Sequence, residues 1–110
     1  GPAGYIGFAP KFSPEKFKAA FTTAEGWGTF TQKLKGGTQA ELITLKWGQL
    51  RLERMAFGLA SGAKTQGVQV VVNEKKVKST WKISGSRIIV SLVKPAIIIK
   101  GQEIRVEIFS

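Results

Sequence analysis

The feature that most constrains the fold is a two-residue alternation of apolar side chains in the last third of the chain. From residue 68 onward, valine, isoleucine and leucine occupy every second position of short runs that end at turn-forming sequences such as Ser-Gly-Ser at 84–86. Successive side chains of a strand point to opposite faces, so this pattern predicts half-buried β-strands. The expected inward-facing sets are Val68, Val70 and Val72, then Ile88, Val90 and Leu92, then Ile104, Val106 and Ile108.

Four further strands are predicted in the first two thirds of the chain. They span residues 17–22, 27–33, 41–47 and 50–59, and the last two are joined by a tight turn around Gly48. An apolar period of 3.6 residues persists nowhere beyond one turn, so no long helix is expected. Seven to eight short strands at spacings of about ten residues indicate an all-β fold, an antiparallel β-sandwich of jelly-roll or immunoglobulin-like type.

The strand predicted over residues 50–59 changes parity partway along. Leu52 and Met55, which both belong in the core, lie at positions of opposite parity. One regular strand cannot place both side chains on the same face. We therefore predict a β-bulge near Glu53 and Arg54, where an extra residue restores a single buried face.

One domain accounts for the chain. A sequence of 110 residues is long enough to bury a core without cross-links. The opening Gly-Pro-Ala-Gly, residues 1–4, is interpreted as a protease-cleavage and cloning scar, which leaves residues 5–110 as a single β-sandwich domain. A scar of this kind predicts that the domain was excised from a longer parent protein.

The residue types that most often carry catalysis or bind metals are absent from the sequence. There is no histidine, cysteine or aspartate, and seven glutamates are the only acids. Nucleophile–histidine pairs and the usual transition-metal sites therefore cannot be assembled. A glycosidase needs two carboxylates that flank one bond, whereas most of these glutamates alternate with lysine or arginine on predicted strands. We expect no catalytic residue, no metal site, no cofactor and no enzymatic activity in this chain.

The charge of the chain favours contact with polyanions. It carries 17 basic and 7 acidic residues, a formal net charge of +10. Lys76, Lys78 and Lys82 form a basic patch on one face of a predicted strand, opposite Trp81. A solvated strand face is the preferred interpretation, because lysine protects exposed strands from edge pairing and single-strand binders place aromatic rings on the basic face itself. Nucleic acid is therefore not an expected partner. The sequence contains no run of 18 apolar residues, so no membrane span is predicted.

Residues 25–28, Glu-Gly-Trp-Gly, form the most distinctive turn in the sequence. Trp27 shares its strand face with Thr29 and Lys33, a polar face that we expect to point outward. Packing is the preferred interpretation, in which the indole covers the edge of the sandwich or contacts a partner domain. The alternative is that its flat face stacks on a sugar ring. Glu25 is expected to stay in solvent.

The other two tryptophans are predicted to pack in the core. Trp47 shares parity with Ile43 and Leu45, which makes it a core or core-rim residue. Trp81 lies with Ile83 on the buried face of its strand. If the domain binds sugar, the candidate carbohydrate-binding residues are Trp27, Glu25, Thr29, Lys33, Trp47 and Tyr5.

The N-terminal part of the chain carries a longer pattern. Residues 6–17, IGFAPKFSPEKF, are followed by Phe21-Thr22 and by residues 24–30, AEGWGTF. This run resembles the segment after the catalytic barrel in bacterial glucosylceramidase-like glycoside hydrolases, relatives of the non-lysosomal glucosylceramidases of glycoside hydrolase family 116. The resemblance is strongest over residues 6–30, and residues 65–110 add little to it.

The resemblance implies a role beside a catalytic domain. In such enzymes an (α/α)₆ barrel carries the nucleophile and the acid/base, so none of the family's catalytic residues is expected in this chain. The expected function is that of a non-catalytic accessory domain that supports this barrel, and contact with carbohydrate is left open as an additional role. An independent carbohydrate-binding module is the alternative, and a basic domain that binds polyanions or nucleic acid is the less favoured one.

Overall fold

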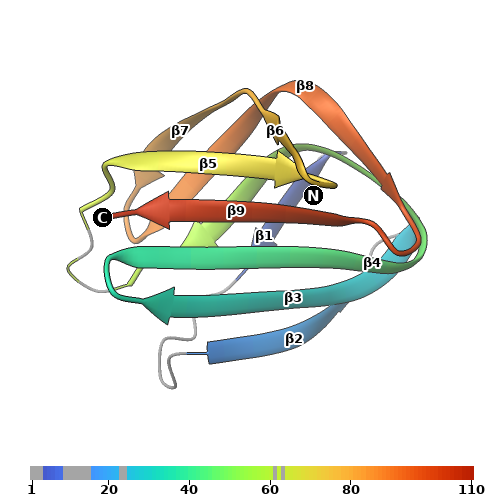
Figure 1. Ribbon diagram of the computed structural model, residues 1–110, viewed down its shortest axis with the longest axis horizontal. Coiled ribbons are helices and arrows are strands. Elements are labelled where there is room, and N and C mark those ends of the chain that lie inside the picture. Colours follow the sequence, from blue (N-terminus) through green and yellow to red (C-terminus); the bar gives the residue numbers. More distant parts are fainter. Residues whose placement is uncertain (1–3, 9–15, 23–24, 61, 63) are drawn as a thin grey trace.

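The computed structural model describes residues 4–8, 16–22, 25–60, 62 and 64–110, with the backbone alone for residues 5, 6, 8 and 16–22. Within these residues the chain forms β-strands and no helix, as the alternation predicts (Figure 1). The nine strands of this described part are β1 (Tyr5–Phe8), β2 (Lys16–Thr22), β3 (Gly26–Lys35), β4 (Thr38–Gly58), β5 (Gly67–Val72), β6 (Lys75–Val77), β7 (Ser79–Ser84), β8 (Arg87–Ile99) and β9 (Glu103–Phe109).

The strands form a sandwich of two sheets that share β4. The larger sheet has the order β2-β3-β4-β9-β5-β6, and the smaller sheet has the order β1-β4-β8-β7. Figure 1 shows β5, β9, β4, β3 and β2 of the larger sheet side by side across the view. The described strands pair antiparallel throughout, except for β1, which runs parallel to β4. The all-β, antiparallel class predicted from the sequence is therefore confirmed.

The tight turn predicted around Gly48 is wrong. Residues 41–47 and 50–59 do not form a hairpin, because β4 runs unbroken through 21 residues. Before Gly48 the strand pairs with β3 and β9, and after it with β8 and β1. Gly48 has a φ of +84°, a backbone conformation that only glycine adopts without strain. This single residue turns the strand out of one sheet and into the other instead of reversing it.

The β-bulge predicted in the second half of β4 is confirmed. Its pairing with β8 shifts register between Leu52 and Arg54. The backbone N–H groups of Glu53 and Arg54 both donate to the carbonyl of Gly4, at 2.7 and 2.9 Å, so two residues share one partner. Leu52 and Met55 are consequently both buried, although their positions in the sequence have opposite parity.

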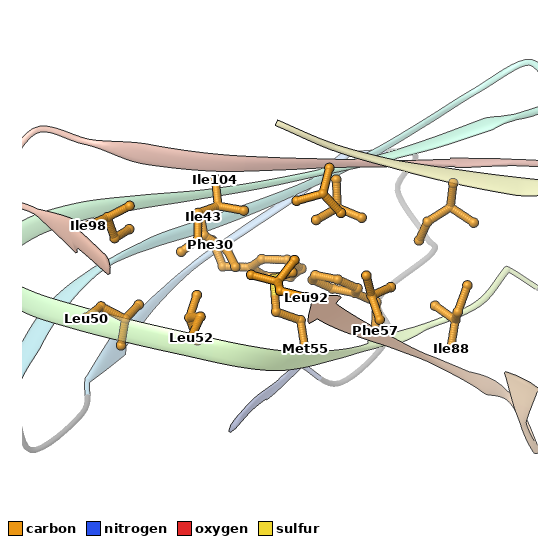
Figure 2. Close-up of a cluster of buried hydrophobic side chains, with 14 of the residues drawn as sticks. Phe30, Ile43, Leu50, Leu52, Met55, Phe57, Ile88, Leu92, Ile98 and Ile104 are labelled. Carbon is orange, nitrogen blue, oxygen red and sulfur yellow. The ribbon is translucent and has the colours of Figure 1, made fainter. Parts of the chain in front are cut away.

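The core lies between the two sheets, and Figure 2 shows its side chains filling that layer. The rings of Phe30 and Phe57, one from each side of the layer, stack with centroids 6.1 Å apart and an interplanar angle of 17°. The three inward-facing sets predicted from the sequence are confirmed. Val70, Ile88, Val90, Leu92, Ile104, Val106 and Ile108 are buried, and Val68 and Val72 are partly buried against the same cluster.

The burial predicted for Trp81 and Ile83 is wrong, although their strand face is right. Trp81 pairs with the buried Val90, so it points toward the interior side of the smaller sheet. β7, however, is the edge strand of that sheet and pairs with β8 alone among the described strands. Because the edge of the sheet is not fully covered by the opposite layer, Trp81 keeps 37% of its surface exposed and Ile83 keeps 46%.

Candidate functional site

Two tryptophans face each other across adjacent strands of the larger sheet. Trp27 of β3 and Trp47 of β4 are register partners, and 47% and 60% of their surfaces are exposed. The outward orientation predicted for Trp27 is confirmed. Side chains directly opposite each other on paired strands have Cβ atoms about 4.5–5.5 Å apart, so the two indoles form neighbouring parts of one surface.

The core position predicted for Trp47 is wrong, and a register shift explains why. Leu45 pairs with Gly28 whereas Trp47 pairs with Trp27, so β4 has one residue more than β3 at this point. That extra residue, Lys46, breaks the alternation, and Leu45 is buried while Trp47 is exposed. Parity read along the sequence therefore fails at this bulge.

The glycines that flank Trp27 are required by the close approach of β3 and β4. A Cβ atom on Gly28 would overlap the carbonyl oxygen of Thr44, and one on Gly26 would overlap that of Trp47. Backbone atoms cannot move aside as a flexible side chain can. The Gly-Trp-Gly sequence thus holds the indole at a point where the two strands lie too close for any other residue.

Exposed polar residues lie close to the two tryptophans in the sequence. Glu25 is exposed, as predicted, and its backbone carbonyl accepts a hydrogen bond of 3.1 Å from the N–H of Gln49. Lys46 and Gln49 are exposed on either side of Trp47 in the sequence. We refer to the exposed residues Trp27, Trp47, Glu25, Lys46 and Gln49 as the tryptophan surface.

The remaining predicted carbohydrate-binding residues lie in different places. Thr29 is half-buried on the same face of β3 as Trp27, one step further along the strand. Lys33 is exposed on that face, but six residues of strand, about 20 Å, separate it from Trp27. The backbone of Tyr5 pairs with Arg54 in the smaller sheet, and its side chain lies outside the described part of the structure.

A buried carboxyl group is the main feature that the sequence interpretation missed. Glu41 of β4 is fully buried, and its Oε1 accepts hydrogen bonds from Gln32 Nε2 at 2.8 Å and from Gln39 Nε2 at 2.7 Å. Burial in the core raises the pKa of Glu41 from 4.5 to about 8, a shift that the two hydrogen bonds only partly oppose. The signal was present in the sequence, because Glu41 has the same parity as Ile43 and Leu45.

The buried cluster has a limited chemical capacity. Two of its acceptor oxygens, Gln32 Oε1 and Glu41 Oε2, have no hydrogen-bond partner. A proton on Oε2 turns that atom from an acceptor into a donor, which suits its apolar surroundings better than a negative charge does. Glu41 is the one fully buried acid among the described residues, so the pair of carboxylates that glycoside hydrolysis requires is not found around it.

The basic patch is divided between the two sheets. Lys76 lies on β6 in the larger sheet and Lys82 on β7 in the smaller one, with Lys78 at the junction between the strands. All three side chains are exposed, as predicted, but they do not share one strand face. Within the described residues, no three or more His, Cys, Asp or Glu side chains gather in an arrangement that fits a metal ion.

Comparisons with known proteins do not assign the chain to a family. No protein-family model matches the chain, and no curated protein matches it. Among the described residues there is no helix that is long and apolar enough to cross a membrane. The tryptophan surface is thus the candidate functional site on the strength of its own residues.

Proposed function

We propose that this chain is a non-catalytic accessory β-sandwich domain of a carbohydrate-active enzyme, and that it contacts carbohydrate through the tryptophan surface. The observation that carries the proposal is the register pairing of Trp27 with Trp47, both of them about half exposed. The glycoside-hydrolase context rests on the resemblance of residues 6–30 to the segment that follows a catalytic barrel.

The chemistry of the tryptophan surface suits a sugar ring. An indole offers a flat apolar face and one N–H donor, and aromatic rings beside polar groups are typical of small-molecule sites that fix the orientation of a ligand. Lys46, Gln49 and Glu25 are exposed polar residues within two positions of the tryptophans in the sequence, and they carry donors and acceptors that suit sugar hydroxyl groups. Gly26 and Gly28 allow the backbones of β3 and β4 to approach closely at this point, which brings the two tryptophans onto one surface.

An accessory position beside another domain is supported by the outer side of β8. Ile97 and Ile99 alternate on this strand and are exposed by 55% and 52%. Isolated apolar residues on a surface need no explanation, but two on one strand face form the kind of surface that a neighbouring domain covers. In the proposed parent enzyme, this domain is the (α/α)₆ barrel that carries the catalytic residues.

Calorimetric titration of the chain with soluble glucans, xylans and mannans tests the proposal. We expect one of these polysaccharides to bind, and Trp27→Ala and Trp47→Ala each to weaken binding by about 1–3 kcal/mol, by analogy with the stacking of bases on aromatic rings. Trp81→Ala is the matched control, because Trp81 is also partly exposed but lies on the other sheet.

Equal affinities for the three single variants would contradict the sugar-binding part of the proposal. The accessory role has a separate test, which is the hydrolysis of aryl-glucosides. Turnover by the purified chain that persists in Glu25→Gln would show that the domain is catalytic. An upstream barrel with paired acids in the parent sequence distinguishes an accessory domain from an independent carbohydrate-binding module, the alternative function.

Nucleic-acid binding is less well supported than sugar binding. The basic side chains Lys76 and Lys82 lie on different sheets, and no aromatic residue alternates with them on a common face. Attraction due to the net charge alone would be nonspecific and would vanish as salt rises to the physiological range. Binding that is selective for sequence and resists salt would favour this function instead.

A further inference from the structure

A groove opens where the chain passes from the larger sheet to the smaller one. β6 and the middle of β8 border it, and both strands can be followed in Figure 1. Its volume is about 510 Å³. This lies within the range of roughly 300–1,000 Å³ that small-molecule sites occupy in proteins.

The groove is built into the backbone pairing of β4 and β8. Opposite Glu53 of β4, β8 places the four residues 92–95, where a regular ladder would have one. Leu92 stays paired with Ser79 of β7, and the N–H of Val93 donates to the carbonyl of Lys78 at 3.1 Å. This hydrogen bond joins the bulged part of β8 to the β6–β7 junction, where both segments line the groove.

Apolar side chains form the floor and part of the rim of the groove. Val72, Val77 and Ala96 line it and also pack against the hydrophobic core. Val93 and Pro95 line its outer part and are exposed. An alkyl chain in the groove would therefore remove both its own surface and an exposed protein surface from water. The described residues that line the groove include no aromatic ring on which a sugar or a base could stack.

Positive charges stand on both sides of this apolar floor. Lys75 and Lys78 line the groove from the β6 side, and Lys94 lines it from β8. All three are exposed, and none belongs to an ion pair among the described residues.

The acids near the groove leave its positive charge in excess. Glu74 precedes Lys75 in the turn between β5 and β6 and does not line the groove. Glu103 donates its backbone N–H to Asn73 at 2.9 Å, but its carboxylate is paired with Arg105 at 3.3 Å. The three lysines therefore line an apolar groove to which the described residues contribute no acid.

We propose that this groove binds a single-chain amphiphile with an anionic head group, a long-chain carboxylate being the simplest member of the class. The alkyl chain lies along Val72, Val77 and Ala96, and the carboxylate lies among the ammonium groups of Lys75, Lys78 and Lys94. Complementary charge and an apolar floor together select this class over neutral sugars and over cationic amphiphiles.

Fluorescence titration with dansyl-undecanoate tests the site. We expect the emission of the probe to rise on binding and dodecanoate to displace it, whereas dodecyltrimethylammonium of equal chain length does not. A triple variant with Lys75→Gln, Lys78→Gln and Lys94→Gln should bind the probe at least about tenfold more weakly. The matched control carries Lys35→Gln, Lys64→Gln and Lys100→Gln, which remove the same charge from exposed lysines away from the groove, and should change the affinity by less than about twofold.

Three results would overturn the proposal. The first is that the emission of the probe does not rise at concentrations below those at which it forms micelles. The second is that the two triple variants weaken probe binding equally, and the third is that the cationic and anionic amphiphiles displace the probe equally. Methyl NMR spectra of the complex locate the probe independently of charge. Shifts at Val72, Val77 and Ala96 are expected, and shifts confined to other methyl groups would place the ligand elsewhere. Circular dichroism of each variant shows whether its fold is intact.

Discussion

Glu41 is the residue whose chemistry departs most from that of a surface glutamate. It lies in the apolar layer between the sheets, and its hydrogen-bond donors are the side-chain amides of Gln32 and Gln39. A charged carboxylate in this layer would lose its hydration, and the two amide hydrogen bonds would only partly replace it. Burial therefore raises the pKa of Glu41 to about 8. The folded chain therefore keeps a proton on Glu41 at neutral pH that the unfolded chain releases.

This difference predicts an unusual dependence of stability on pH. Between the unfolded value of 4.5 and the folded value of about 8, the folded state binds one more proton than the unfolded state at Glu41. The contribution of Glu41 to the free energy of unfolding is therefore full below pH 4.5 and falls as the pH rises toward 8. Urea unfolding at several pH values should show a loss on the order of 4 kcal/mol at most across this window.

Glu41→Gln should remove this pH dependence. The glutamine supplies an N–H donor in place of the protonated oxygen and keeps an acceptor oxygen for Gln32 and Gln39. We therefore expect the variant to be more stable than the unsubstituted chain at pH 8. Glu74→Gln, at an exposed turn position, is the control. If the free energy of unfolding of Glu41→Gln falls with pH as steeply as that of the unsubstituted chain, another group controls the pH dependence.

At this scale the sequence predicted the strand face of Trp27 and Trp81 correctly, but it misplaced Trp47 and was a poor guide to how deeply a residue is buried. Trp81 lies on the predicted face, but its exposure depends on whether another sheet covers β7. Glu41 has the parity of a core residue, yet a charged residue type argued against burial until the amide partners from β3 and β4 were known. Burial depends on contacts distant in sequence, which periodicity does not contain.

At the scale of elements, β4 connects the two sheets and sets the position of almost every other strand. Its bulge at Glu53 and Arg54 keeps Leu52 and Met55 on one face, and this was predictable because the parity change is visible in the sequence. The change of sheet at Gly48 was not predictable in the same way. A glycine with positive φ serves equally well in a hairpin and in a strand that changes direction.

The bulge predicts an unusual tolerance to deletion within a strand. Removing Glu53 gives Leu52 and Met55 the same parity, so a regular strand would still bury both side chains. We expect this variant to fold and to lose about 1–2 kcal/mol, from the hydrogen bond to Gly4 and from local repacking. Thermal unfolding followed by circular dichroism, with an amide NMR spectrum, measures the effect.

Deletion of Thr44 is the matched comparison. It lies between the buried residues Ile43 and Leu45 in a part of β4 with regular alternation, so its removal places one of them on the outer face. This deletion should cost at least about 4 kcal/mol or prevent folding. If deletion of Glu53 is as damaging as deletion of Thr44, the bulge does not set the register of β4.

At the scale of the whole molecule, both candidate surfaces lie where the chain changes sheet. The tryptophan surface lies next to Gly48, where β4 leaves the larger sheet, and the groove lies at Lys78, where β6 gives way to β7. At both points the backbone departs from regular strand pairing. The sequence predicted two layers and their core, but the places where strands cross between the layers are set by long-range pairing.

The central claim is that Trp27 and Trp47 act together as a sugar-binding platform. Its most direct test is an NMR titration of the indole N–H signals with gluco-, xylo- and manno-oligosaccharides, because the chain has three tryptophans and therefore three such signals. We predict that the signals of Trp27 and Trp47 shift together with one of these sugars while that of Trp81 stays in place. Signals of Trp27 and Trp47 that stay unmoved by all three sugars, or a shift confined to Trp81, would contradict the account.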